Sequence, residues 1–219
     1  MTIEVWPHII SLADYFNSRF NHTGILQPVQ DYGWANYVYT SDQYRRAHVE
    51  IVDHRDSHKM YILHCTIFPH VNDPSPIFGF DAVCGQHKIT GAFHDYSSTG
   101  NIVNPMYKWF ESLSNSYQWK KPRQLPEWAQ SIFSDSIIAA GNVNTQDELD
   151  ALCALASKSL DYYLANVGYN TSHGDYTAGQ NKYCHHQRQN PHVVRSMVSM
   201  GIDQSLMLDF VDNMLFPFS

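Results

Sequence analysis

The stretch MYILHCTIF, residues 60–68, is the clearest indication of the fold, because β-branched, aromatic and other apolar side chains fill it and one histidine interrupts them. Such a run is typical of a buried strand. Similar runs occupy residues 44–53 and 77–84, and the connections HRDSH, residues 54–58, and VNDPSP, residues 71–76, are rich in turn formers. Connections this short join antiparallel neighbours. The sequence therefore predicts an antiparallel meander, with further strands at residues 34–40 and 89–96.

Helical patterns flank these strands. The clearest spans residues 145–167, where Thr145 and Glu148 have the spacing of a capping box and Gly168 ends the apolar stripe. Residues 131–140 have the pattern of one more strand. The other predicted helices cover residues 9–20, 105–117, 176–187, 193–200 and 206–215. With no internal repeat and no linker-like change of composition, we expect a single domain over residues 1–219. Its fold class would be α/β, a three-layer α/β/α sandwich with a central antiparallel sheet.

Composition narrows the class of protein. The 219 residues are 43% hydrophobic and only 16% charged, which supports a folded core. The net charge of −7 disfavours nucleic acid or an anionic membrane as the main partner. No uncharged apolar run approaches the roughly 20 residues of a bilayer span, and the four cysteines form no CxxC pair. We therefore expect a cytoplasmic protein that binds neither nucleic acid nor a membrane.

Thirteen histidines, against 14 lysines and arginines together, raise the question of a metal site. His54 with His58, and Cys184 with His185 and His186, are the candidates, but neither group has the spacing of a known ligand set. The sequence also lacks a GxSxG elbow, a GxGxxG loop and a Walker loop. We therefore expect no metal, no bound nucleotide cofactor and no serine hydrolase chemistry.

Strand register brings three ionisable residues together. Facing residues of an antiparallel hairpin have numbers that sum to twice the centre of the turn. Glu50 and His64 centre their turn on Ser57, and His64 and Asp81 centre theirs between residues 72 and 73, both within turn-forming segments. Glu50, His64 and Asp81 should therefore lie side by side on one face of three strands, with Cβ atoms about 4.5–5.5 Å apart.

Such a group suits proton transfer. Two carboxylates beside an imidazole in a partly dry pocket titrate together, and burial raises the pKa values of the acids towards neutrality. A proton donor needs such a pKa. Gly79, two residues before Asp81, should leave room for a ligand on the same face. The alternative is a hydrogen-bonded core histidine with acids that face solvent.

Basic and aromatic residues leave two interpretations open. The tight basic groupings are ordinary surface charge or bind the carboxylates of a substrate or an acidic partner. The aromatic content of 14% is normal for packing, and would also suit a pocket for a large flat ligand. The basic residues in question are Arg45, Arg46, Lys120, Lys121 and Arg123.

Five motifs occur in one order along the chain. They are RAHVE at residues 46–50, LHCTIFP at 63–69, PIFGFD at 76–81, RQLPEW at 123–128 and NKYC at 181–184. In these motifs the chain resembles the ferredoxin-dependent bilin reductases. Within that family it is most similar to the phycocyanobilin:ferredoxin oxidoreductase lineage, and there to the compact phage-type phycoerythrobilin synthases. The resemblance runs from about Trp34 to Pro217.

The resemblance implies a fold, a reaction and roles for residues. It implies an α/β/α sandwich that binds biliverdin IXα between the sheet and the C-terminal helices. Electrons would come singly from reduced [2Fe-2S] ferredoxin, with no cofactor bound to the protein, which we expect to be a monomer. Glu50, His64 and Asp81 match the catalytic residues of the family. His48 matches a second pocket histidine, and Arg123 matches an arginine that binds a propionate.

Four pocket positions bear on the product. Asn190 matches a position that is asparagine in the phycocyanobilin branch and aspartate in another four-electron branch. Phe80 replaces a cysteine, His192 replaces a propionate-binding lysine and Thr90 replaces a serine. From the resemblance we expect four-electron reduction to phycoerythrobilin through 15,16-dihydrobiliverdin. Phycocyanobilin is the alternative product, and a non-catalytic bilin carrier is a more distant alternative function.

Overall fold

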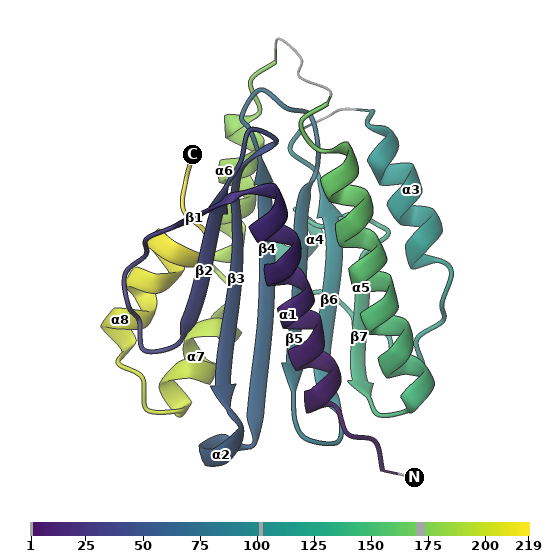
Figure 1. Cartoon of the computed structure of the whole chain (residues 1–219), viewed down its shortest axis with the longest axis vertical. Helices are drawn as coiled ribbons and strands as arrows, with labels where there is room; N and C mark the ends of the chain where they lie inside the picture. Colours follow the sequence, from purple (N-terminus) through teal and green to yellow (C-terminus); the bar gives the residue numbers. More distant parts are fainter. Residues whose placement is uncertain (1, 101–102, 170–173) are drawn as a thin grey trace.

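The central layer of the protein is one seven-stranded antiparallel sheet. The computed structural model describes residues 2–100, 103–169 and 174–219. Each strand pairs with the next along the chain, so the spatial order is β1-β2-β3-β4-β5-β6-β7 (Figure 1). The bounds are β1 Ile25–Gln27, β2 Ala35–Thr40, β3 Tyr44–His54, β4 Met60–Pro69, β5 Ile77–Cys84, β6 Ile89–Ser97 and β7 Ile138–Val143.

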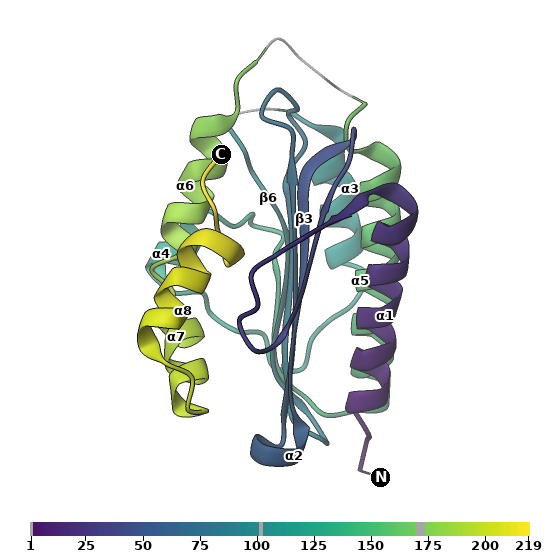
Figure 2. The same cartoon turned by 60° about the vertical axis from the view of Figure 1, so that its left-hand side comes forward.

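Helices cover both faces of this sheet, as Figure 2 shows with the sheet seen edge-on. On one face lie α1 Trp6–Thr23, α3 Pro105–Ser114 and α5 Gln146–Asn166. On the other lie α4 Glu127–Gln130, α6 Thr177–Gln187, α7 Pro191–Ser199 and α8 Gln204–Asp209, which continues into the π-helical segment η1 Phe210–Leu215. The short helix α2 Arg55–His58 lies in the β3–β4 turn. The predicted three-layer α/β/α sandwich is confirmed.

The alternation of side chains along each strand separates two cores. In β4, Leu63 and Cys65 belong to the core under α1 and α5. On the other face, Phe68 packs in a second core with Tyr183 of α6 and Phe210 of η1. His64 lies between Leu63 and Cys65 in sequence, so it points away from the first core and towards the C-terminal helices.

The predicted register is confirmed. Glu50 pairs with His64 across β3 and β4, and His64 pairs with Asp81 across β4 and β5. The turns VNDPSP and HRDSH hold this register, and the second of them forms α2. Hydrophobic burial on both faces fixes it as well, because a slip of one residue would move every apolar side chain of β4 to the wrong face.

Three local predictions were wrong. Residues 25–27 form the edge strand β1, where we expected only a helix end and a turn. The last strand is Ile138–Val143 instead of residues 131–140, because Ser134 makes side-chain and backbone hydrogen bonds to Asp95 and the chain there forms turns. Thr145 does not cap α5, since its hydroxyl donates instead to the Glu148 carboxylate at 3.0 Å.

Over the described ranges, none of the helices combines the length and apolar character needed to cross a membrane.

Candidate active site

The three residues that strand register predicted lie on the floor of a cavity of about 410 Å³. Glu50, His64 and Asp81 all line it. Glu50 is only 6% exposed, whereas the side chain of Asp81 is 34% exposed. His64 Nδ1 lies 3.8 Å from Asp81 Oδ1, which is within ion-pair range when the imidazole is protonated. The structure thus brings two carboxyl groups and an imidazole together on the floor of a single pocket.

The opposite wall is largely apolar. It comes from α4, the segment after it, α7 and the residue that follows η1, and contains Trp128, Phe133, Val193, Met197 and Phe216. A cavity of this size is in the usual range for organic ligands, about 300–1,000 Å³. A flat apolar molecule would therefore have aromatic and aliphatic contacts on one side and proton-exchanging groups on the other.

Burial raises the pKa of Glu50 from 4.5 to about 7. Three neighbours modify this effect: His64 and a hydrogen bond from Trp34 lower the pKa, and Asp81 raises it. Trp34 Nε1 donates to Glu50 Oε1 at 2.9 Å. A carboxyl group with this pKa is divided between its protonated and ionised forms at neutral pH, which is what proton donation there requires.

His64 is held by its own strand and by the C-terminus. Its Nε2 lies 2.5 Å from the hydroxyl of Thr66, two residues along β4 on the same face. The ring of Phe216 meets it edge-on, with centroids 5.9 Å apart and an interplanar angle of 90°. With the ring held in this way, Nδ1 of His64 faces the Asp81 carboxylate.

His48 is close to His64 but does not line the cavity. Its ring centroid is 6.4 Å from that of His64, and Phe210 packs on it at 6.3 Å. The ring is completely buried, and Nε2 bonds to Asn36 Oδ1 at 2.9 Å. Burial, Arg46 and His64 lower the pKa of His48 well below its usual value, so it is neutral. Phe210 of η1 packs on this histidine, which is therefore not among the residues that line the cavity.

Arg123 lies at the edge of the pocket, beyond β6. Its side chain crosses two glycines: a Cβ added to Gly141 would lie 3.0 Å from Arg123 Nε, and one added to Gly91 would lie 3.1 Å from Nη1. The guanidinium is 5.8 Å from the ring of Phe93. Within the described part of the chain it has no hydrogen bond or ion pair through its side chain. A cation placed this way can receive a ligand carboxylate.

Gly141→Ala should displace Arg123 and weaken binding of a carboxylate-bearing ligand about tenfold, the effect of one lost charge-assisted hydrogen bond. Absorbance titration with biliverdin, the ligand that the sequence resemblance implies, measures the change in Kd. Gly85→Ala is the matched control, since its added Cβ would meet nothing closer than 3.7 Å. Unchanged affinity in Gly141→Ala would show that the glycines do not place the guanidinium.

Three of the other residues predicted from the sequence lie at the pocket. Asn190, His192 and Thr90 line the cavity. The Asn190 side chain also caps α7, because its Oδ1 accepts from the backbone N–H of His192 at 3.0 Å. The Thr90 hydroxyl donates to the carbonyl of Val83 at 3.0 Å.

Two predictions about β5 need correction. Phe80 does not face the pocket: it points to the other side of the sheet and packs edge-on against Phe16 of α1, with centroids 5.5 Å apart. The reason is strand alternation, since Asp81 next to it faces the cavity. Gly79 is on the cavity side, but the hydroxyl of Tyr183 fills the space over it, 3.3 Å from where a Cβ would be.

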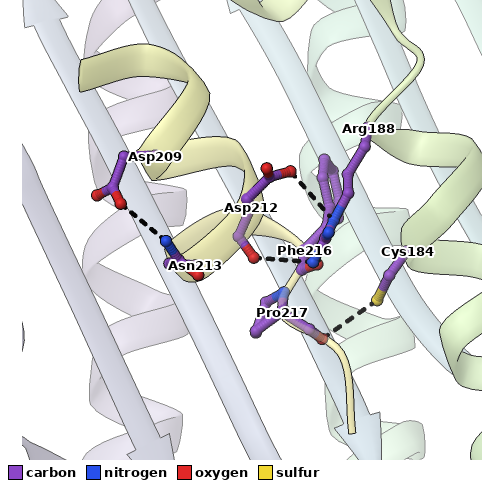
Figure 3. A network of polar contacts seen from close by, with 7 residues as sticks. All are labelled: Cys184, Arg188, Asp209, Asp212, Asn213, Phe216 and Pro217. Carbon is purple, nitrogen blue, oxygen red and sulfur yellow. Dashed lines mark hydrogen bonds and ion pairs between the residues drawn. The ribbon is translucent and has the colours of Figure 1, made fainter. Parts of the chain in front are cut away.

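The C-terminal wall is held by α6, as Figure 3 shows. Arg188 Nη2 donates to the carbonyls of Phe216 and Asp212 at 2.8 and 2.9 Å, and its Nε is 3.4 Å from the Asp212 carboxylate. Cys184 Sγ donates to the Pro217 carbonyl at 3.4 Å. These bonds fix the backbone on both sides of Phe216, whose ring packs on His64. No sequence pattern assigned a functional role to Arg188, Phe216 or Trp34.

In residues 2–100, 103–169 and 174–219, no three His, Cys, Asp or Glu side chains are grouped so that they could hold a metal ion. His54 and His58 are near each other on α2 and its boundary, with ring centroids 5.4 Å apart, but without a third ligand there. All four cysteines are free thiols.

Comparison with known proteins points to one family. Residues 10–217 match the model of the ferredoxin-dependent bilin reductases. The phycocyanobilin:ferredoxin oxidoreductase of Synechococcus sp. (strain CC9902) is 28% identical over 193 residues, which are 83% of this chain and 75% of that protein. The enzyme of the same name from Trichodesmium erythraeum (strain IMS101) is 34% identical over 102 residues, 46% of this chain and only 40% of the relative.

Solved structures agree with this. The structure of PcyX has a TM-score of 0.70 and 26% identity, and the match covers 96% of this chain and 99% of that one. Tomato phytochromobilin synthase, crystallised in complex with biliverdin, has a TM-score of 0.74 over 96% of this chain and 82% of its own, and at 14% identity it shows the fold alone. From the match over residues 10–217, the chain belongs to the ferredoxin-dependent bilin reductase family.

Proposed function

We propose that the protein catalyses the ferredoxin-dependent four-electron reduction of biliverdin IXα to phycoerythrobilin, through 15,16-dihydrobiliverdin. The observation that carries this proposal is the row of Glu50, His64 and Asp81 on the floor of a cavity with an apolar opposite wall. A pigment carrier has no need for three proton-exchanging groups at that place. Membership of the family supplies the substrate class and the electron donor.

The reaction needs four electrons and four protons, delivered in two two-electron steps. Each electron that enters the conjugated tetrapyrrole gives a radical that is more basic than the neutral bilin, so a proton must follow from a group within hydrogen-bond reach. We assign the first proton to Asp81, the most exposed of the three side chains of the row. His64 would hold a lactam carbonyl and relay protons, and Glu50 would serve a position on the D ring.

Arg123 and the rim of the pocket would orient the substrate. Its guanidinium lines the cavity and has no hydrogen bond or ion pair with the described residues, so it is available for a propionate. His192 and Thr90 lie on the same cavity and would complete the rim. The flat tetrapyrrole would lie between the sheet and Phe216, Met197 and Trp128, which supply apolar contact.

Phycocyanobilin is the second candidate product, because curated relatives are phycocyanobilin:ferredoxin oxidoreductases. Resemblance to the compact phage-type enzymes favours phycoerythrobilin instead. Asn190 also lacks the carboxyl group of the branch that uses an aspartate there, which leaves His64 and Asp81 to support both steps.

A stepwise absorbance assay distinguishes an enzyme from a carrier. Biliverdin alone should change its spectrum on binding in either case. Addition of reduced ferredoxin under anaerobic conditions should then bleach and shift the bound spectrum in successive stages only if the protein is a reductase. A bound spectrum that stays constant with reduced ferredoxin would support the carrier.

Ferredoxin docking should depend on a local basic surface, because ferredoxins are acidic and this chain carries a net charge of −7. Lys120 and Lys121 lie on the exposed segment that leads to Arg123 at the pocket. Raising the ionic strength from about 0.01 to 0.5 M should therefore lower turnover several-fold, since salt screens exposed charges. A turnover rate independent of salt would contradict electrostatic docking. Biliverdin affinity measured without ferredoxin is the control.

A further inference from the structure

The indole of Trp34 contacts the most buried carboxyl group of the site from outside the pocket. Trp34 directly precedes β2, and its Nε1–H donates to Glu50 Oε1 at 2.9 Å. It is not among the residues that line the cavity, whereas Glu50 is. The indole therefore approaches one oxygen of the carboxylate from the side of β2 and leaves the other, Oε2, for a ligand.

Packing fixes the indole in this place. Phe210 of η1 meets it at 4.8 Å between centroids and 67°, and Tyr32 at 5.9 Å and 45°. The Tyr32 hydroxyl donates to Asp209 at 2.9 Å, and burial together with Asp209 raises its pKa to about 12, so the phenol keeps its proton at neutral pH. Asn36 adds a bond from its side-chain amide to the Trp34 carbonyl at 3.0 Å.

The groups around Glu50 act in opposite directions. His64 on β4 favours the ionised form of Glu50. Asp81 on β5 favours its protonated form, and so does burial. His48, on the same strand, is neutral and bonded to Asn36. His64 and Asp81 act on the Glu50 carboxyl group through charge. The indole N–H does not titrate, so it is the one constant donor to this carboxylate that the described residues provide.

We propose that Trp34 is a positioning residue, whose indole N–H fixes the Glu50 carboxyl in one orientation and keeps its proton transferable at neutral pH. This inference rests on the proposed function for the identity of the proton acceptor. The hydrogen bond itself, which offsets part of the effect of burial on the pKa of Glu50, is a property of the protein without its substrate. It can therefore be tested alone.

The direct test is a pH titration of the Glu50 carboxyl by infrared difference spectroscopy, without bilin. Its band is identified by its loss in Glu50→Gln. In the wild type the midpoint should be at about pH 7. In Trp34→Phe, which keeps the aromatic contacts with Phe210 but lacks the N–H, the midpoint should rise by about one pH unit, because a donor to the charged form has gone. An unchanged midpoint would overturn the inference.

Trp119→Phe is the matched control. It also removes an indole, but the buried N–H of Trp119 has no partner among the described residues. The midpoint of Glu50 should stay at the wild-type value in this variant. An equal rise in both variants would attribute the effect to loss of any indole and would also overturn the inference.

A second measurement needs no substitution of Trp34. In 15N-labelled wild-type protein, the chemical shift of one of the five indole N–H signals should change with pH, with the same midpoint as the Glu50 carboxyl group. This pH dependence should be absent in Glu50→Gln. If no indole signal depends on Glu50, the hydrogen bond does not exist in solution. These outcomes are independent of catalysis, so a protein that passes both tests but never reduces biliverdin would refute the proposed function and leave the role of Trp34 in orienting Glu50 intact.

Turnover then connects the bond to the reaction. In Trp34→Phe the high-pH limb of the kcat profile should move up by about one pH unit, and the maximum should fall several-fold, because the carboxyl is no longer held in one orientation. In a Glu50→Gln background the same substitution should leave the profile unchanged. A shift that persists in that background would assign a merely structural role to Trp34.

Discussion

Asp81→Asn should lower the rate of biliverdin reduction about a hundredfold or more and leave biliverdin binding within a few-fold of the wild type. Proton transfer by a positioned side chain contributes roughly 10²–10⁴ to a rate. The amide has the shape of the carboxyl group and can still form hydrogen bonds, but it cannot deliver a proton. Since the Asp81 side chain is 34% exposed, the substitution should disturb the fold little.

Single-turnover kinetics with reduced ferredoxin measure this rate, and absorbance titration measures binding. Asp53→Asn is the matched control, since it makes the same chemical change on β3 in an exposed ion pair with Arg55, away from the cavity. It should react at the wild-type rate. If Asp81→Asn reduced biliverdin at the wild-type rate to the same final product, the assignment of Asp81 as first proton donor would be wrong.

Glu50→Gln should slow turnover at neutral pH at least about tenfold and remove one limb of the pH profile. Burial raises the pKa of Glu50 to about 7, so the protonated form, which can donate, predominates below pH 7 and is lost above it. The wild-type kcat should therefore fall as the pH rises through about 7. The glutamine variant carries no such proton at any pH, so its slow rate should not change over this range.

The same substitution has a stability signature. Folding raises the pKa of Glu50 from 4.5 to about 7, so the folded protein holds this proton more tightly than the unfolded chain. The resulting stabilisation is fully present below about pH 4.5 and is lost as the pH rises through about 7. In thermal unfolding, the Tm of Glu50→Gln minus the Tm of the wild type should increase between about pH 5 and pH 8. A constant difference would mean that Glu50 is not buried as a carboxyl group.

Much of the sheet could be predicted because its strands are bounded by strong turn formers. In an antiparallel meander, the position of each turn centre determines which residues of the two joined strands face each other. The pairing of Glu50 with His64, and of His64 with Asp81, follows from the two turn centres. The three-residue edge strand β1 could not be predicted, because Ile25 and Leu26 are exposed and carry no burial pattern. The π-helical end of the C-terminal helix likewise has no sequence signal that separates it from an α-helix.

The site could be predicted only where one strand decides which side a residue faces. Alternation correctly placed Asp81, and the same alternation shows why Phe80 lies on the opposite face against Phe16. His48 shares the face of His64, yet a residue 162 positions later, Phe210, covers it. The roles of Trp34 and Phe216 depend on such long-range packing, which no spacing within a strand reveals.

Chromatographic identification of the product shows whether this pocket reduces biliverdin and to which pigment. Biliverdin IXα would be incubated anaerobically with the protein, ferredoxin and a reducing system, with samples taken over time and a control without ferredoxin. We predict that 15,16-dihydrobiliverdin appears first and phycoerythrobilin accumulates as it disappears. Phycocyanobilin as the final pigment would replace the proposed product. Unchanged biliverdin, bound but never reduced, would show that the protein does not catalyse the proposed reduction.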